Sequence, residues 1–195
     1  MTAPRCPTIH DHPLAYVQRL TPRSLQDVDL VVIHCTELPD LAMARTFGER
    51  VLYDSGTGNS GHYYIDRDGS CHQYVPLERC AHHVRGYNER SVGIELVNRG
   101  RWPNWFDSTQ QQMDEPYTAA QIDTLIALLQ WLPTQLPALH WIAGHDALDL
   151  AREAASDLPG ATVSRKLDPG PLFPWQEVLA ATHLQRLPAD QAPGR

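Results

Sequence analysis

Short apolar runs alternate with amphipathic stretches along the chain. The run Asp29–His34 is β-branched and ends on a polar residue, which predicts a buried strand. Residues 91–97 and 140–143 are similar runs, and we expect strands there too. Residues 62–75 predict a hairpin, because they carry the turn dipeptide Asp-Gly.

Helices are predicted between these strands. Thr118 and Gln121 form a capping box, after which apolar residues recur at helical spacing until Pro133 ends the helix. Three further segments have helical character: residues 40–50, residues 146–155, and a C-terminal stretch with Pro174 in its first turn. Residues 98–116 are polar and predict a long surface loop, a kind of segment that is often functional.

Strands that alternate with helices predict an α/β fold, here a single domain with a central, mostly mixed β-sheet flanked by helices. A chain of 195 residues suits one domain with a substantial core. We expect an irregular N-terminal lead-in over residues 1–28, the domain over 29–187, and a frayed C-terminal tail over 188–195.

Composition narrows the class of protein. The formal net charge of -7 argues against nucleic-acid binding, because phosphate backbones are held by clustered Lys and Arg. No apolar stretch approaches the roughly 20 residues of a membrane span, and the N-terminal stretch lacks the pattern of a signal peptide. None of the four cysteines forms a CxxC pair, so we expect reduced thiols and a cytoplasmic protein, without nucleic-acid or membrane partners.

Three residues form a candidate metal-binding set. His34 ends one apolar run, His145 follows another, and Asp168 lies in a stretch stiffened by prolines. Two imidazoles and one carboxylate suit a catalytic zinc ion, because three protein ligands leave the fourth position for water. Each histidine could equally be a hydrogen-bonded structural residue, since the spacing alone carries little information.

Glu95 and the basic pair Arg165 and Lys166 are candidates for the accompanying chemistry. A carboxylate within an apolar strand either faces solvent or lies in a site, where desolvation would raise its pKa towards that of a general base. The basic pair is either a solvated surface feature or a source of one ammonium group that stabilises an oxyanion.

Several motifs occur together, in one order, between about Val31 and Trp175. They are Val-Val-Ile-His34, Gly61-His62-Tyr-Tyr-Ile-Asp-Arg-Asp-Gly69, His82-His83 before Gly86, Asn88 through Ser91-Val-Gly-Ile-Glu95, Ala-Gly-His145 and Arg165-Lys-Leu-Asp-Pro-Gly-Pro-Leu-Phe-Pro-Trp175. In this order the motifs resemble the zinc amidases of the AmpD and peptidoglycan-recognition-protein superfamily.

The resemblance implies an N-acetylmuramoyl-L-alanine amidase acting on peptidoglycan or muropeptide fragments. It implies one zinc ion held by His34, His145 and Asp168. Glu95 would activate the water, and Lys166 would stabilise the tetrahedral intermediate. Residues that match substrate-contacting or rim positions are Arg165, His62, His83 and Asn88. For His62 and His83, a structural role is the alternative.

Two departures from the family pattern stand out. A Tyr precedes the residue matching His62 in some relatives, whereas Gly61 stands here. The segment between His145 and Lys166 is longer than in the shortest relatives, and we expect a lid or rim there. The other histidines are treated as non-functional: His10, His12, His72, His82, His140 and His183.

Other assignments stay open. A non-catalytic peptidoglycan-binding module and a zinc peptidase acting on a stem-peptide bond are the alternative functions. A monomeric cytoplasmic recycling enzyme is the expected setting, and a phage-type lysin is the alternative. Trp102 and Trp105 could stack on a sugar or anchor their loop on the domain.

Overall fold

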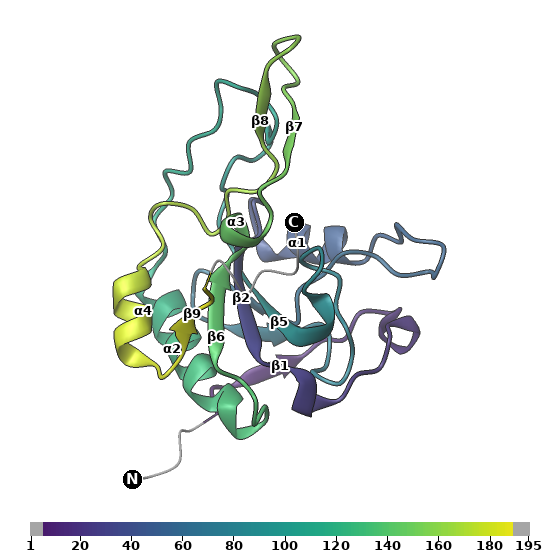
Figure 1. Cartoon of the computed structure of the whole chain (residues 1–195), viewed down its shortest axis with the longest axis vertical. Coiled ribbons are helices and arrows are strands. Elements are labelled where there is room, and N and C mark those ends of the chain that lie inside the picture. Colours follow the sequence, from purple (N-terminus) through teal and green to yellow (C-terminus); the bar gives the residue numbers. More distant parts are fainter. Residues whose placement is uncertain (1–5, 189–195) are drawn as a thin grey trace.

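A mixed β-sheet forms the centre of the computed structural model, which describes residues 6–188 (Figure 1). The expected frayed tail therefore lies almost wholly outside the described residues. Two parallel strands, β2 (Leu30–Cys35) and β5 (Ser91–Leu96), lie side by side in the middle of the sheet. Nearly every residue of both strands is buried, as their apolar sequences predict.

The described part of the chain forms a seven-stranded sheet in the order β1-β4-β3-β5-β2-β6-β9. The remaining strands of this sheet are β1 (Ile9–Asp11), β3 (Tyr63–Ile65), β4 (Cys71–Gln73), β6 (Trp141–Gly144) and β9 (Gln185–Arg186). Within the described part of this sheet, β3 and β4 alone pair antiparallel, as a hairpin whose turn has Gly69 at φ 85°. The predicted hairpin and mixed sheet are confirmed.

Helices α2 (Ala119–Trp131) and α4 (Trp175–Ala181) pack on one face of the sheet. The predicted capping box is present, since the Thr118 side chain accepts from the Gln121 backbone and the Gln121 side chain accepts from the Thr118 backbone. Pro174 precedes α4 as its N-cap instead of lying in its first turn. The apolar side chains of this layer form the largest core cluster.

The opposite face is covered by α1 (Leu41–Gly48), the N-terminal segment and irregular loops. The N-terminal segment has little regular structure, but it adds β1 to the sheet and buries Leu14 and Tyr16 in the core. Residues 6–188 also contain four 3-10 turns: Val17–Arg19, Leu25–Asp27, Asn88–Arg90 and Leu132–Thr134. Among the residues described, no helix has the length and apolar character that a membrane crossing needs.

The predicted helix over 146–155 is wrong. Helix α3 (His145–Leu148) lasts a single turn, and β7 (Arg152–Ala154) then pairs antiparallel with β8 (Thr162–Ser164). The helix ends because Asp149 takes an extended conformation, and its carboxylate accepts from the Ala151 N–H. The resulting hairpin projects from the domain beside the loop of residues 98–116 (Figure 1).

Candidate active site

Strand alternation places His34 and Glu95 on the face of the sheet opposite α2. Val31 and Ile33 of β2 pack into the core cluster with α2, so the side chain of His34 points the other way. Glu95 lies directly across from His34 in the register of β2 and β5, and cross-strand neighbours share a face. The His34 Nδ1 and Glu95 Oε1 atoms are 4.0 Å apart.

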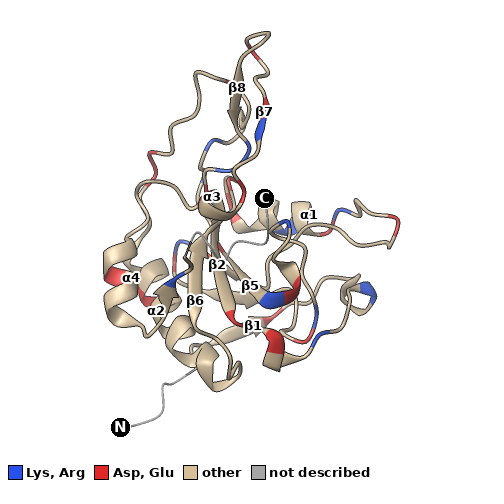
Figure 2. Cartoon of the chain, viewed as in Figure 1, with Lys and Arg blue, Asp and Glu red and all other residues tan. Residues whose placement is uncertain are grey.

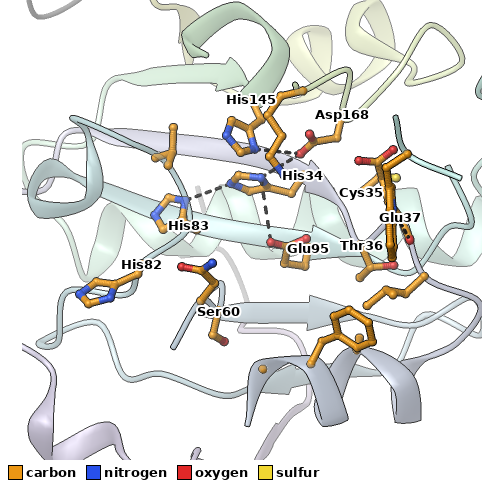
Figure 3. A pocket seen from close by; sticks show the side chains of 18 of the residues that line it. His34, Cys35, Thr36, Glu37, Ser60, His82, His83, Glu95, His145 and Asp168 are labelled. Atoms are coloured by element: carbon orange, nitrogen blue, oxygen red, sulfur yellow. Dashed lines mark hydrogen bonds and ion pairs between the residues drawn. The ribbon is translucent and has the colours of Figure 1, made fainter. Parts of the chain in front are cut away.

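His145 and Asp168 reach the same point from two other segments. His145 is the first residue of α3, directly after β6, and Asp168 lies in the loop before α4. The Asp168 Oδ2 atom lies 3.0 Å from His34 Nδ1 and 3.2 Å from His145 Nδ1. One ligand atom from each residue can be chosen so that all three lie within 4.8 Å of one another. Figure 3 shows the three side chains pointing toward one another.

The protonation and burial of these groups suit a metal ion. Burial lowers the pKa of His34 to about 4, so its imidazole is neutral at ordinary pH. Burial would raise the pKa of Asp168, but the neighbouring His145 and His34 outweigh it and hold that pKa well below its ordinary value. His145 Nε2 and Asp168 Oδ1 are buried without a hydrogen-bond partner. A buried donor or acceptor without a partner is a place where a bound ion or water fits.

His83 contacts the ring nitrogen of His34 that does not face Asp168. The His83 Nδ1 and His34 Nε2 atoms are 3.0 Å apart, and the other ring nitrogen of His83 lies 3.2 Å from Ser91 Oγ. Gly93 makes room for this ring, since a Cβ at that position would come within 2.6 Å of it. His83 therefore orients His34, a role that sequence reasoning had left open as structural.

Glu95 is largely buried, with 14% of its side chain exposed. Burial, and then the nearby Asp168 carboxylate, raise the pKa of Glu95 well above its ordinary value, against the opposing effect of Lys166. Gly61 lies behind Glu95, and a Cβ at this glycine would stand 2.8 Å from the Glu95 Cγ. The departure at Gly61 thus provides the space that Glu95 occupies.

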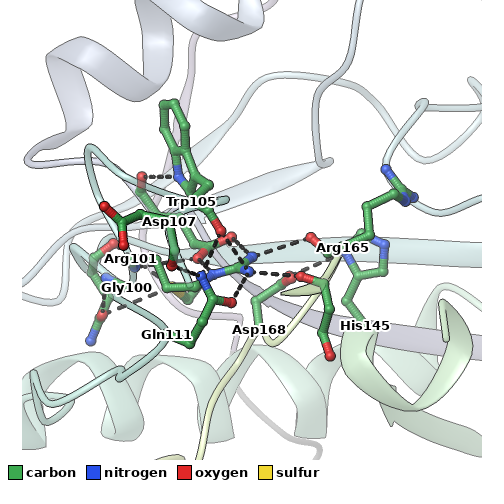
Figure 4. A network of polar contacts seen from close by, with 12 residues as sticks. Gly100, Arg101, Trp105, Asp107, Gln111, His145, Arg165 and Asp168 are labelled. Carbon is green, nitrogen blue, oxygen red and sulfur yellow. Dashed lines mark hydrogen bonds and ion pairs between the residues drawn. The ribbon is translucent and has the colours of Figure 1, made fainter. Parts of the chain in front are cut away.

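Arg101 holds the loop and the hairpin against the site, a role that sequence reasoning missed. Its guanidinium is buried against Glu37, with an Nε–Oε1 distance of 2.6 Å. It also donates to the backbone carbonyls of Trp105, Ser164 and Arg165. Figure 4 shows Arg101 beside Trp105, Gln111 and Arg165. No local pattern marks this arginine, because its partners lie up to 64 residues away.

A cavity of about 590 Å³ opens in front of the cluster. His34, Glu95, His145 and Asp168 line its floor together with Lys166 and Arg165, and an ion pair joins Arg165 to Asp149. Acidic and basic residues lie close together at the foot of the β7–β8 hairpin (Figure 2). The cavity can therefore bind a substrate that carries both polar and anionic groups.

The tryptophans of the long loop pack on the domain. Trp102 and Trp105 contact each other edge to face, and both lie against the ring of Phe47. The Trp105 indole donates to the Glu37 carbonyl and also lines the cavity. Both residues anchor the loop, and only Trp105 is placed to contact a ligand as well.

Two of the residues expected to contact substrate hold the scaffold together. The structure corrects the expectation for His62, whose fully buried ring accepts from the Gly93 N–H and lies 3.1 Å from the Arg79 carbonyl, outside the cavity. Asn88 does line the cavity, but its side-chain oxygen accepts from the backbone N–H groups of His83 and Val84.

This fold, with a His-His-Asp cluster that could hold a metal ion, matches one family of hydrolases. The family described as N-acetylmuramoyl-L-alanine amidase matches residues 24–171, so the chain belongs to this family. The AmpD 1,6-anhydro-N-acetylmuramyl-L-alanine amidase of Enterobacter cloacae is 38% identical over 120 residues, covering 57% of this chain and 50% of that protein. The AmiD amidase of Escherichia coli K12 is 35% identical over 114 residues, covering 54% of this chain and 36% of that protein. The chain thus spans about half or less of these curated relatives.

Solved structures share the fold. The complex of Escherichia coli AmiD with an anhydro-N-acetylmuramic acid tripeptide aligns with a TM-score of 0.60 at 25% identity, covering 80% of this chain and 57% of that chain. The amidase LysC of Clostridium intestinale has a TM-score of 0.64 at 22% identity, covering 92% and 99%. A Drosophila peptidoglycan recognition protein has a TM-score of 0.61 at 17% identity, covering 97% of both chains. The last two show the fold alone.

Proposed function

We propose that the protein hydrolyses the amide bond between N-acetylmuramic acid and L-alanine in muropeptide fragments. The observation that carries this proposal is the convergence of His34, His145 and Asp168 beside Glu95 at the floor of one cavity. We propose that these three residues hold one zinc ion. A zinc ion in such a site polarises a carbonyl and lowers the pKa of a bound water to about 7.

Glu95 serves as the general base in this proposal. A general base works best when its pKa lies near the working pH, and the raised pKa of Glu95 is a shift in that direction. Glu95 takes a proton from the attacking water and returns it to the departing amine of L-alanine. Glu95 lies on β5 directly across from His34, so the pairing of the two strands fixes the distance between the general base and the ligand cluster.

Lys166 and Arg165 supply the positive charge. Lys166 lines the same cavity as Glu95 and Asp168, and its charge lowers the pKa of both carboxyl groups. In this proposal its ammonium stabilises the oxygen anion of the tetrahedral intermediate. We propose that Arg165 contacts an anionic part of the muropeptide, and that His83 and Asn88, which line the same cavity, form part of the wall against which the substrate lies. His62 is assigned to the scaffold.

Soluble fragments are the proposed substrate, in preference to the intact wall. AmpD of Enterobacter cloacae is named for the 1,6-anhydro sugar, and AmiD has been solved with an anhydro-muropeptide. The net charge of -7 gives no electrostatic attraction to an anionic wall. We place the protein in the cytoplasm as a monomer, a setting that the four unpaired cysteines suit. Cell fractionation and sedimentation would test this placement.

Product analysis combined with metal analysis tests the function. The protein should contain one zinc per chain and release a free peptide beginning with L-alanine from an anhydro-muropeptide, as identified by mass spectrometry. Glu95→Ala should keep the zinc and lose turnover. Cleavage within the stem peptide would instead identify a peptidase. Substrate binding without any cleavage would identify a binding module.

A further inference from the structure

Three histidines outside the active site gather at the edge of the sheet. His10 and His12 lie two residues apart on the extended segment that begins with β1, so their side chains point to the same face. His72 lies on β4, directly across from His10 in the parallel pairing. The fold therefore collects on one surface three imidazoles from two segments about 60 residues apart in sequence.

The three rings are close together and nearly parallel. Ring centroids are 5.1 Å apart for His10 and His72, 5.2 Å for His12 and His72, and 6.2 Å for His10 and His12. The Nδ1 atoms of His12 and His72 are 3.1 Å apart. Two imidazole nitrogens bound to one tetrahedral zinc ion, each at 2.0–2.1 Å from it, lie about 3.3 Å apart. The His12–His72 pair is thus already near the spacing of two ligands on one ion.

One ring nitrogen of His72 makes a hydrogen bond, which is the usual way in which a metal-binding histidine is oriented. Its Nε2 atom lies 3.2 Å from Ser70 Oγ, so a hydrogen bond fixes the ring with Nδ1 turned toward His12. As the side chains stand, the three edge histidines do not yet offer three nitrogens to one point, so the proposal requires His10 to change rotamer. His10 and His12 are exposed to solvent, and exposed side chains change rotamer readily. Burial and then the neighbouring His10 and His12 lower the pKa of His72, against the opposing effect of Asp66 and Asp68.

This cluster is separate from the active site. His72 pairs with Tyr64 across the hairpin, and Tyr64 pairs with Glu95, which pairs with His34. Three strand spacings of about 4.8 Å put His72 roughly 14 Å from His34, too far for one ion to bind both. None of the three edge histidines lines the cavity.

We propose that His10, His12 and His72 form a second, solvent-exposed site for a divalent transition-metal ion of the kind that imidazole binds, such as Zn²⁺ or Ni²⁺. The ion links β1 to β4. Strand β1 is a three-residue edge strand whose ladder partner is β4, so this link fastens the N-terminal segment to the hairpin. Binding to the folded chain alone then raises its stability.

Titration with Ni²⁺ tests the proposal on the full chain. The unmodified chain should bind one more equivalent than the double variant His10→Ala/His12→Ala, and Ni²⁺ should raise its Tm more. His183→Ala, which removes an exposed histidine elsewhere, should behave like the unmodified chain. This difference between chains does not depend on whether the His34 cluster holds zinc, so failure here and failure of the amidase proposal are distinguishable.

Nuclear magnetic resonance of the unmodified chain provides a second measurement that needs no variant. Saturating Zn²⁺ should shift the imidazole nitrogen signals of His72 and His12 and leave those of His183 in place. Equal binding by the unmodified chain and the double variant would overturn the proposal. Imidazole signals of His72 that do not respond to Zn²⁺ would overturn it as well.

Discussion

Replacing Gly61 with Ala tests whether the position of Glu95 limits catalysis. The added Cβ would lie 2.8 Å from the Glu95 Cγ, whereas ordinary contact begins at 3.4 Å, so one of the two groups must move by 0.6 Å. The Cβ would also be 3.2 Å from the Gly93 carbonyl oxygen, and the backbone cannot retreat from β5 without loss of the hydrogen bond that the His62 N–H donates to this carbonyl. The Glu95 side chain is therefore the group that moves.

The size of the effect follows from that displacement. A misplacement of about 1 Å in a catalytic group can cost around 100-fold in rate, so a shift of this size should lower kcat by roughly tenfold. The cost in folding free energy should stay within about 1–3 kcal/mol, the range for an added methyl group in a packed region. Zinc content should not change, because His34, His145 and Asp168 are untouched.

The assay is steady-state hydrolysis of an anhydro-muropeptide, with zinc content and Tm measured on the same preparation. Gly48→Ala is the matched control, since its Cβ would meet nothing closer than 3.6 Å. This control should keep both kcat and Tm near the values of the unmodified chain. A Gly61→Ala protein with unchanged kcat, or one that has lost its zinc, would refute the reasoning about Glu95.

Three other predictions concern the surroundings of the cluster. His83→Ala should weaken zinc binding by about 10–100-fold in competition with a chelator, because His34 loses the ring that orients it. Arg101→Ala should destabilise the fold by about 3–5 kcal/mol in thermal unfolding, because Glu37 is left buried and unpaired. Removal of zinc by a chelator should abolish turnover and lower Tm. The free energy of unfolding should fall by up to about 4 kcal/mol relative to protein at a free zinc concentration of 1,000 times the Kd. Added zinc should restore both.

Each of these outcomes has a control within the chain. His140→Ala changes a histidine that meets the Trp141 ring edge to face, away from the cluster, and should leave zinc affinity unaltered. Arg101→Met combined with Glu37→Leu removes both charges and should recover part of the lost stability. Equal zinc affinity in His83→Ala, or full stability in Arg101→Ala, would contradict the assigned roles. Turnover that survives complete removal of the metal would contradict the zinc proposal.

Features governed by neighbouring residues could be predicted from the sequence. The apolar runs at Asp29–His34 and residues 91–97 predicted the strands that carry His34 and Glu95. That the two side chains share a face depends on the register of β2 with β5, which the sequence left open. The capping box of α2 and the turn at Gly69 were predictable because their hydrogen bonds join residues three or four positions apart.

Sequence patterns gave no account of contacts between distant segments. The prediction of a helix over 146–155 failed because the ion pair between Asp149 and Arg165, and the pairing of β7 with β8, outweigh local helical preference. The role of His62 as a scaffold residue depends on the Gly93 backbone of another strand, and that of Arg101 on Glu37.

By itself, the sequence determined the short strands, the capped helix, and the residue types able to bind zinc and move a proton. The tertiary structure alone decided which of those residues meet. His34 and Asp168 are 134 positions apart, and only the order of the strands brings their atoms to 3.0 Å. The same holds for the three edge histidines, which become neighbours only because β1 pairs with β4. Local preferences act over a few residues, whereas a site of this kind requires the chain to close long loops and bury the sheet on both faces.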